Sequence, residues 1–241
     1  MIIKKDVCIG CRKCLPYCPV GAITFKKSIS MVDQDRCYEC GTCLRNAKCP
    51  VDAIKESPFV FDFPRSVRKA FSDPTVTHVQ TGVAGRGTEE SKTNDVTGRI
   101  KRGEVGIGIE VGRPNVGIRI ADIEVITRAL AETGVAVYEP QNPTTYFIKD
   151  FKTGEIKEEY KKERILSGIL EIKTNRKNLP VLLRALNRVI PECKGIFSLD
   201  VITRLDPGTR IPVLDLLRKE GFPPRAHAKI NPGLGRPLKE D

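Results

Sequence analysis

The segment from Cys8 to Ile23 reads CIGCRKCLPYCPVGAI, and the segment from Cys37 to Ile54 repeats it as CYECGTCLRNAKCPVDAI. In each copy three cysteines fall at intervals of three residues, and a fourth cysteine directly precedes a proline. Such self-similarity indicates an internal repeat of one structural unit. The two copies contain eight of the nine cysteines of the chain, so any account of the sequence has to explain this repeat first.

The spacing of these cysteines favours iron-sulfur clusters. Three thiolates at C-x2-C-x2-C spacing can wrap one cubane, and Gly10 and Gly41 permit the tight backbone path between them. The fourth thiolate comes from the other copy, because the short segment after the third cysteine leads the chain away to the second cluster. We therefore expect two 4Fe-4S clusters, one held by Cys8, Cys11, Cys14 and Cys49 and the other by Cys37, Cys40, Cys43 and Cys18.

Zinc and disulfides are the alternatives to iron and sulfide. A tetrahedral zinc ion needs only four ligands and gives no reason for a third cysteine at the same interval. A disulfide framework needs an oxidising compartment, and the chain reads MIIKKDVC up to its first cysteine, with no apolar signal segment. Both alternatives explain the pattern less well than two clusters do.

On these eight cysteines, and on Cys18-Pro19 and Cys49-Pro50, residues 1–57 resemble the bacterial-type ferredoxins that carry two 4Fe-4S clusters. The first run fits C-x2-C-x2-C-x3-C-P, whereas the second has five residues between Cys43 and Cys49. The resemblance implies an electron-transfer protein of anaerobic metabolism. Such a protein passes low-potential electrons through both clusters to a partner oxidoreductase.

The longer second run leads to a hypothesis about redox tuning. Its extra residues include Arg45 and Lys48, which would place positive charge near the cluster completed by Cys49. Positive charge favours the reduced, more negative cluster and would raise its potential relative to the other one. A surface insertion that leaves the cluster untouched explains the same residues.

Composition bounds the rest of the chain. With 241 residues, the chain is long enough for a further domain with its own core. No apolar run approaches the roughly 20 residues of a membrane span, and we expect a cytoplasmic protein. The formal charge of +11 favours an acidic redox partner, an anionic cofactor or nucleic acid, although a solvated lysine-rich surface explains it equally well.

Residues 58–102 lack hydrophobic periodicity and are expected to form a connector with a glycine-rich polar loop. Gly82, Gly85 and Gly87 could hold an anion on successive backbone amides, with Arg86 beside them. The segment matches neither a P-loop nor a dinucleotide fingerprint. A plain surface loop is the alternative.

Regular structure is expected to return over residues 103–205. Alternation predicts a strand at 105–111, and apolar spacing predicts a helix over 121–132. Further along the chain the pattern predicts a strand from 135, a hairpin with its turn at 152–154, a strand over 165–174, a helix from Asn178 and a strand over 195–204. Residues 206–241 are expected to form one more helix, about 212–220, and an extended tail.

This element order predicts an α+β protein, in which a small dicluster ferredoxin domain, 1–57, precedes a split βαβ domain, 103–205. By its topology the second domain is similar to the ACT and NIL types of ferredoxin-like domain. Such domains host ligand sensing, docking and dimerisation, so a homodimer through this domain is one expectation. NIL-type modules occur fused to two-cluster ferredoxins in anaerobes, where they are linked to reductive sulfur incorporation.

No catalytic constellation is present in the sequence. His78 and His227 are too isolated to propose a metal site, and Cys193 remains as an ordinary thiol. The leading expectation is a non-enzymatic electron carrier or oxidoreductase subunit. The alternative is an electron-supplying component of a reductive enzyme, for example in sulfur metabolism, whose anionic substrate or cofactor is held by Gly85, Arg86, Gly87, Arg113 and Arg119. A redox sensor that binds nucleic acid is a third expectation, which the few aromatics and the lack of a recognition helix make weaker.

Overall fold

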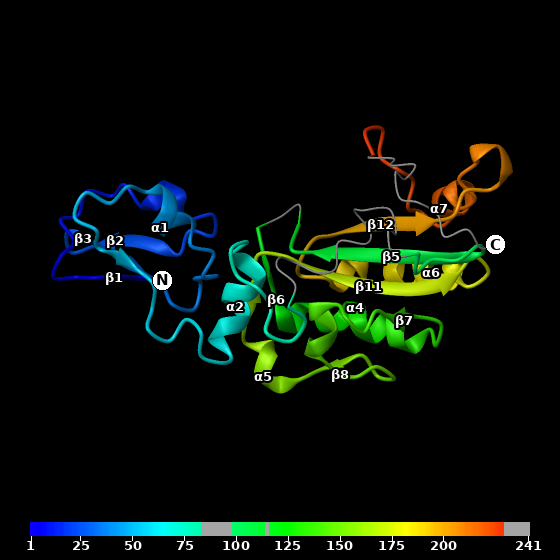
Figure 1. Ribbon diagram of the computed structural model, residues 1–241, viewed down its shortest axis with the longest axis horizontal. Coiled ribbons are helices and arrows are strands. Elements are labelled where there is room, and N and C mark those ends of the chain that lie inside the picture. Colours follow the sequence, from blue (N-terminus) through cyan, green and yellow to red (C-terminus); the bar gives the residue numbers. More distant parts are fainter. Residues whose placement is uncertain (83–97, 114–115, 229–241) are drawn as a thin grey trace.

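The computed structural model describes residues 1–82, 98–113 and 116–228 of the chain. Its N-terminal part contains two small antiparallel pairs (Figure 1), in which β1 (Ile2–Ile3) pairs with β4 (Ile54–Lys55) and β2 (Ile23–Lys26) pairs with β3 (Ile29–Val32). A 3-10 turn, η1 (Leu15–Tyr17), and a short helix, α1 (Thr42–Asn46), complete it. Small apolar residues and cysteines fill the core between them, including Ile3, Ala22, Ile23, Ala53 and Ile54.

Helix α2 (Arg65–Ser72) lies between the N-terminal part and the rest of the chain (Figure 1). The sequence predicted a connector at this position, without a helix. Val67 and Phe71 of α2 are buried and pack into the same core as the following sheet. Helix α2 is therefore packed structure rather than a spacer.

The larger part of the chain is built on a four-stranded antiparallel sheet. Its strands are β5 (Glu104–Val111), β7 (Val137–Tyr138), β11 (Gly168–Asn175) and β12 (Phe197–Thr203). They lie in the order β12-β5-β11-β7. Ile109 of β5, for example, lies opposite both Leu170 of β11 and Leu199 of β12, which places β5 inside the sheet.

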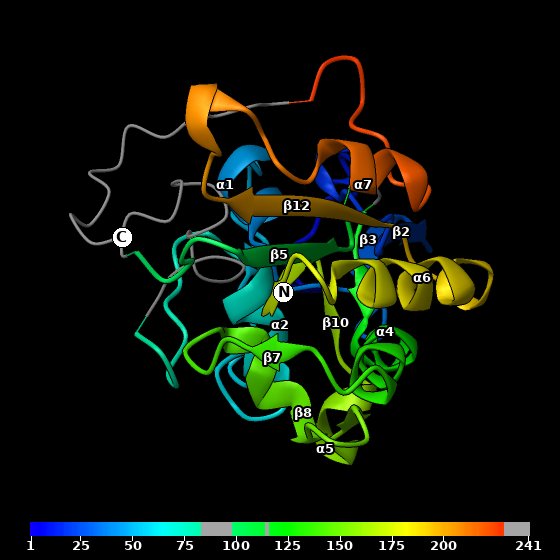
Figure 2. The ribbon, with the colours of Figure 1, turned by 90° about the vertical axis from the view of Figure 1, so that its right-hand side faces the viewer.

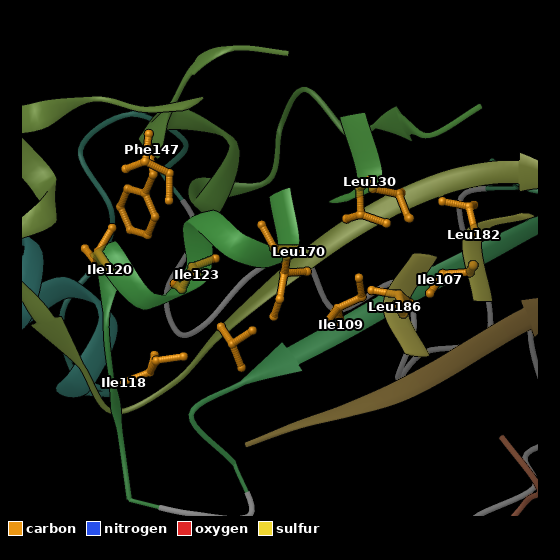
Figure 3. Close-up of a cluster of buried hydrophobic side chains, with 14 of the residues drawn as sticks. Ile107, Ile109, Ile118, Ile120, Ile123, Leu130, Phe147, Leu170, Leu182 and Leu186 are labelled. Atoms are coloured by element: carbon orange, nitrogen blue, oxygen red, sulfur yellow. The ribbon is translucent and has the colours of Figure 1, made fainter. Parts of the chain in front are cut away.

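Two helices, α4 (Ile120–Glu132) and α6 (Leu179–Val189), cover one face of this sheet (Figure 2). Because side chains alternate along a strand, Ile107 and Ile109 both point to this face. They meet Leu130 of α4 and Leu182 of α6 (Figure 3), and all four are almost fully buried. Each such side chain contributes about 1.5–3 kcal/mol when removed from water.

The connections carry smaller elements. A strand pair, β6 (Ile118–Arg119) with β10 (Arg164–Ile165), lies next to α2, and the hairpin of β8 (Ile148–Asp150) and β9 (Glu155–Ile156) is followed by α5 (Glu158–Lys161). Further 3-10 turns are η2 (Pro143–Phe147), η3 (Ile190–Glu192) and η4 (Pro207–Thr209). The last helix is α7 (Leu214–Lys219), whose buried Leu217 joins the large core.

The elements expected from periodicity occur at or near their predicted positions. The helix over 121–132 is α4, and the helix from Asn178 is α6, with Asn178 at the N-cap position but without a capping hydrogen bond from its side chain. The predicted hairpin is β8–β9, with its turn at 151–154. Within the described residues, no helix combines the length and the apolar character needed to cross a membrane.

Candidate iron-sulfur sites

Two hollows in the N-terminal part are each lined by four cysteines. The hollow that we call the first cysteine site is lined by Cys8, Cys11, Cys14 and Cys49. The second cysteine site is lined by Cys18, Cys37, Cys40 and Cys43. In both sites, three cysteines come from one copy of the repeat and the fourth comes from the other.

The backbone around the two sites repeats as the sequence does. The amide of Ala22 donates to Cys18 Sγ at 3.0 Å, and the equivalent amide of Ala53 donates to Cys49 Sγ at 3.3 Å. Amide donors stabilise thiolate charge, which is one of the properties that an iron-sulfur site requires. The donor set of both hollows, with these amide donors, therefore fits a 4Fe-4S cluster.

The tight turns between the cysteines depend on positive φ angles, but glycine is not in the same place in the two copies. Gly10 has φ of +68°, whereas its equivalent Glu39 has φ of +57°. Conversely, Gly41 has φ of +69° and its equivalent Arg12 has φ of +60°. Each copy thus has one glycine and one strained residue in the left-handed region, where non-glycine residues are uncommon.

Burial makes some of these cysteines hard to ionise without a metal. Burial raises the pKa of Cys43 to about 12, and the charges of Cys40, Cys37 and Cys18 add to the effect. Burial likewise raises the pKa of Cys14 and of Cys37. Grouped thiolates are stable here only when cations offset their charge, and the iron of a cluster provides that charge.

A cubane and a single metal ion need different separations between their thiolate ligands. Among the residues that the structure describes, no group of three or more His, Cys, Asp or Glu side chains is placed to hold one metal ion. A cubane takes one thiolate at each of four irons, so its ligands lie further apart than those of a single ion.

The two extra residues of the second copy lie in the stretch that contains helix α1. Where the first copy has the 3-10 turn η1, the second has the α-helical turn α1. Arg45 of α1 donates to the Cys40 carbonyl at 2.6 Å and to Asp73 at 2.9 Å. Cys40 lines the second site, and Asp73 neutralises the Arg45 charge. The hypothesis that Arg45 and the exposed Lys48 raise the potential of the first site stays a prediction.

The second cysteine site is covered by the rest of the chain. Tyr38, which directly follows Cys37, is buried against Gly117, so closely that a methyl group added at Gly117 would lie 1.9 Å from the Tyr38 ring. Arg68 of α2 donates to the carbonyl oxygens of Gln34 and Asp35, both at 3.0 Å, and to that of Cys37 at 2.8 Å.

Glu39, the second residue after Cys37, lies close to these contacts, and its carboxylate is fully buried. It pairs with Arg65 of α2 and with the amino group of Met1. Burial alone would raise the pKa of Glu39, but these contacts outweigh burial and hold it below its usual range. Sequence reasoning missed Glu39, Arg65 and Arg68. The only signal was the helical spacing of Val67 and Phe71 beside several basic residues.

The other residues singled out from the sequence do not join the cysteine sites. Arg113 and Arg119 are exposed, and Gly85, Arg86 and Gly87 lie outside the described residues. His78 is buried with its ring against Phe71. Cys193 is half-buried in the larger part of the chain, where burial raises its pKa.

Comparisons with known proteins identify the repeat. The 4Fe-4S dicluster domain matches residues 7–53. Ferredoxin-2 of Chlorobaculum tepidum is 40% identical over 55 residues, which cover 20% of this chain and 86% of that protein. The pyruvate synthase subunit PorD of Methanothermobacter marburgensis is 43% identical over 53 residues, or 22% of this chain and 59% of PorD. One protein of an ion-translocating oxidoreductase complex of Methanosarcina acetivorans is 46% identical over 48 residues, or 20% of this chain and 17% of that protein.

Through this segment the chain belongs to the 4Fe-4S dicluster ferredoxin family, and its N-terminal part is an electron-transfer domain with two 4Fe-4S clusters. The match ends at residue 53, and no family matches the remainder. The chain spans 17% and 59% of the length of the two relatives that are parts of complexes. No solved structure matches the chain significantly.

Proposed function

We propose that this protein exchanges low-potential electrons, through its two clusters, with a partner oxidoreductase. Each 4Fe-4S cluster supplies reversible one-electron oxidation and reduction. The observation that carries the proposal is the pair of equivalent four-cysteine hollows within one small domain. Two of its relatives are named as subunits of pyruvate synthase and of an ion-translocating oxidoreductase complex, which is consistent with a protein partner.

The proposed ligands are the cysteines of each hollow. Cys49 would complete the first site, and Cys18 would complete the second. Their equivalent hydrogen bonds from Ala53 and Ala22 support the exchange of the fourth ligand between the copies. The zinc and disulfide alternatives do not account for this twofold arrangement.

The chain's own residues would set different conditions at the two sites. Arg68 and Arg65 lie next to the Cys37 end of the second site, and each is paired with a carboxylate, Glu163 and Glu39. Burial of Tyr38 and Cys37 keeps water away from that end, whereas Cys11 of the first site is exposed, and solvent exposure is one of the factors that set the potential of a cluster. The second site is therefore proposed to differ in potential from the first.

We further propose that residues 103–205 form a ferredoxin-like domain of the ACT or NIL type. Its strands appear in the chain as β5, β7, β11 and β12 and lie in the sheet in the order β12-β5-β11-β7. Two helices on one face complete the split βαβ arrangement. The packing of Val67, Phe71 and Leu217 in the same core supports counting α2 and α7 with this domain. A homodimer through it stays a prediction.

The test is an anaerobic coulometric titration of the purified holoprotein. We expect about two electrons per chain, one for each cluster, delivered reversibly by dithionite and removed by a viologen dye. An uptake of fewer than about one electron, or irreversible bleaching of the visible absorbance, would contradict an electron carrier.

A second candidate function rests on one observation in the β6–β10 pair. Arg119 of β6 lies directly opposite Arg164 of β10, two residues from the Gly117 contact with Tyr38. Like charges directly opposite each other destabilise a strand pair, and an anion between them would relieve the repulsion. The chain would then be the electron-supplying component of a reductive enzyme with an anionic substrate or cofactor.

Titration calorimetry with phosphate, sulfate and sulfite tests this candidate. Binding of any of them that Arg119→Ala weakens at least tenfold, with Arg128→Ala as the control, would favour it. Arg128 is a half-exposed arginine paired with Glu124 on α4. Absence of binding by all three anions would eliminate this function and leave the carrier.

A further inference from the structure

The two copies of the repeat present very different surfaces. The residue after the first cysteine is Ile9 in one copy, 64% exposed, and Tyr38 in the other, 7% exposed. Cys11 is exposed, whereas its equivalent Cys40 is half-buried. Arg12 is exposed, whereas its equivalent Gly41 is buried against Arg45 and Asp73.

The cause of this asymmetry is the chain itself. Gly117 and α2 occupy the surface of the second copy, through the Tyr38 and Arg68 contacts. Among the described residues, the matching surface of the first copy carries no such cover, and the cysteine ligand Cys11 reaches solvent there. Among the described residues, the first of the two proposed cluster sites is thus the more exposed on this side, where another protein could reach it.

This open surface has an apolar centre and a basic rim. Ile9, Arg12 and Lys13 line the first cysteine site itself. Gly10 packs on the turn between β2 and β3, close to the Ser28 carbonyl, so the exposed Lys26 and Lys27 of that turn lie beside it. The guanidinium of Arg12 is held over the Phe25 ring, 3.9 Å from its centroid.

The rim is predominantly basic. Residues 1–32 contain six Lys or Arg and one acidic residue, Asp6, and the exposed Asp52, next to two residues that line the site, is paired with Lys55. An apolar centre inside a charged, solvent-accessible rim has the composition of a transient protein interface. A rim of one sign steers partners of the opposite sign to the apolar centre.

We propose that the surface formed by Ile9, Arg12, Lys13, Lys26 and Lys27 is the docking site for an acidic redox protein, which exchanges electrons through the first cysteine site. This proposal rests on the proposed electron-carrier function and adds to it the partner's charge and the entry point. In each encounter one electron passes between the partner and the chain. One protein is oxidised and the other reduced by that electron, and no bond is formed or broken.

The experiment compares two one-electron acceptors of opposite charge. Dithionite-reduced holoprotein is mixed anaerobically with oxidised plastocyanin, which is acidic, or with oxidised cytochrome c, which is basic. Stopped-flow absorbance gives the rate of electron transfer at low and high salt. We expect plastocyanin to react at least tenfold faster than cytochrome c at low salt, and this advantage to shrink as salt rises.

Charge variants locate the surface. The double variant Lys13→Glu, Lys26→Glu should slow the plastocyanin reaction about tenfold. The control, Lys152→Glu with Lys177→Glu, makes the same change of charge on exposed lysines of the larger part of the chain. Lys27→Asn is a milder second variant, because asparagine tolerates the φ of +50° at that position. Iron and sulfide contents confirm that each variant holds its clusters.

Equal rates for both acceptors, or equal slowing by the control, would overturn the proposal. A second result would also overturn it. If duplex DNA bound the protein, and the Lys13 and Lys26 variant lost DNA binding but kept its rate with plastocyanin, the surface would be a nucleic-acid site. Reoxidation by a small viologen dye separates this outcome from the carrier function. If the dye also fails to accept electrons, the carrier function fails, independently of the docking site.

Discussion

Arg68 of α2 and Glu163, the residue before β10, form an ion pair, and their side chains are only 7% and 8% exposed. Arg68 also satisfies three backbone carbonyls at the entrance to the second copy of the repeat. Arg68 thus connects the ferredoxin-type domain to the larger part of the chain, together with the Tyr38–Gly117 contact and the Arg65–Glu39 pair.

Arg68→Gln should therefore destabilise the protein strongly. The substitution leaves Glu163 charged and buried without its partner, which costs about 3–5 kcal/mol. It also removes positive charge near Cys37, so the potential of the second site should fall. Anaerobic urea unfolding measures the first effect and a redox titration the second. Arg218→Gln breaks an exposed pair with Asp215 and should cost less than about 1 kcal/mol; a similar loss from both variants would contradict the role of Arg68.

Gly117→Ala should break the contact between Gly117 and Tyr38 next to the second site. The new methyl group would meet the Tyr38 ring at 1.9 Å, at a φ of +83°, and overpacking with backbone strain costs about 2–4 kcal/mol. Gly134→Ala is the matched control, since its φ is +65° and nothing lies within 4 Å of the added methyl. It should cost only about 1 kcal/mol. Quenching of tyrosine fluorescence by iodide, with Tyr38→Phe as the reference that leaves only the other four tyrosines, reports the exposure of Tyr38. If Gly117→Ala and Gly134→Ala behave alike, the contact is unimportant.

Asp73 should make stability depend on acid pH. Burial alone would raise the pKa of Asp73, but hydrogen bonds from Lys69, Arg45 and Thr75 outweigh it and lower the pKa to about 2. A folded pKa below the unfolded value of about 3.9 adds stability above pH 4, which is lost as the pH falls from about 4 to 2. Its size is about 2 kcal/mol.

Asp73→Asn should abolish this part of the pH dependence. The wild type should lose its advantage over the variant between about pH 4 and pH 2, while the difference between them stays constant from pH 5 to pH 7. Acid unfolding followed by far-ultraviolet circular dichroism measures it. If the stability difference between wild type and variant grew as the pH fell, the folded pKa of Asp73 would not be lowered.

Removal of iron should unfold the N-terminal part and spare the sheet. The core of the N-terminal part consists of small apolar residues and cysteines, including Ala22, Ala47 and Ala53, and small domains with thin cores depend on their metal. The larger core, around Ile107, Ile109 and Leu130, has no cysteine ligand. After anaerobic chelation, hydrogen exchange should speed up over residues 1–57 and stay slow over β5 and β11. Uniform loss of protection would show that the larger part does not fold independently of the clusters.

The sequence was most informative at the cysteines, because cluster binding requires them at fixed spacings. The cysteine repeat predicts which four cysteines line each hollow, because the path from Cys14 to Cys18, or from Cys43 to Cys49, has to leave one site and reach the other. Helices α4 and α6 were predictable because each buries one apolar face.

Helix α2 and the docking of the two parts were not predictable. The burial of Arg68 and Lys69 depends on partners far along the chain, Glu163 for one and Glu56 for the other, and no local pattern records such pairs. Asp73, the partner of Arg45, likewise lies far along the chain, so the sequence could not predict that pair.

The most direct test of the account is an anaerobic redox titration followed by electron paramagnetic resonance, with iron and sulfide counted on the same sample. Two equivalent hollows in different surroundings predict about eight iron and eight sulfide per chain, and two spin-coupled 4Fe-4S signals that appear at separate potentials. One cluster per chain, or zinc in place of iron, would contradict the account at its base.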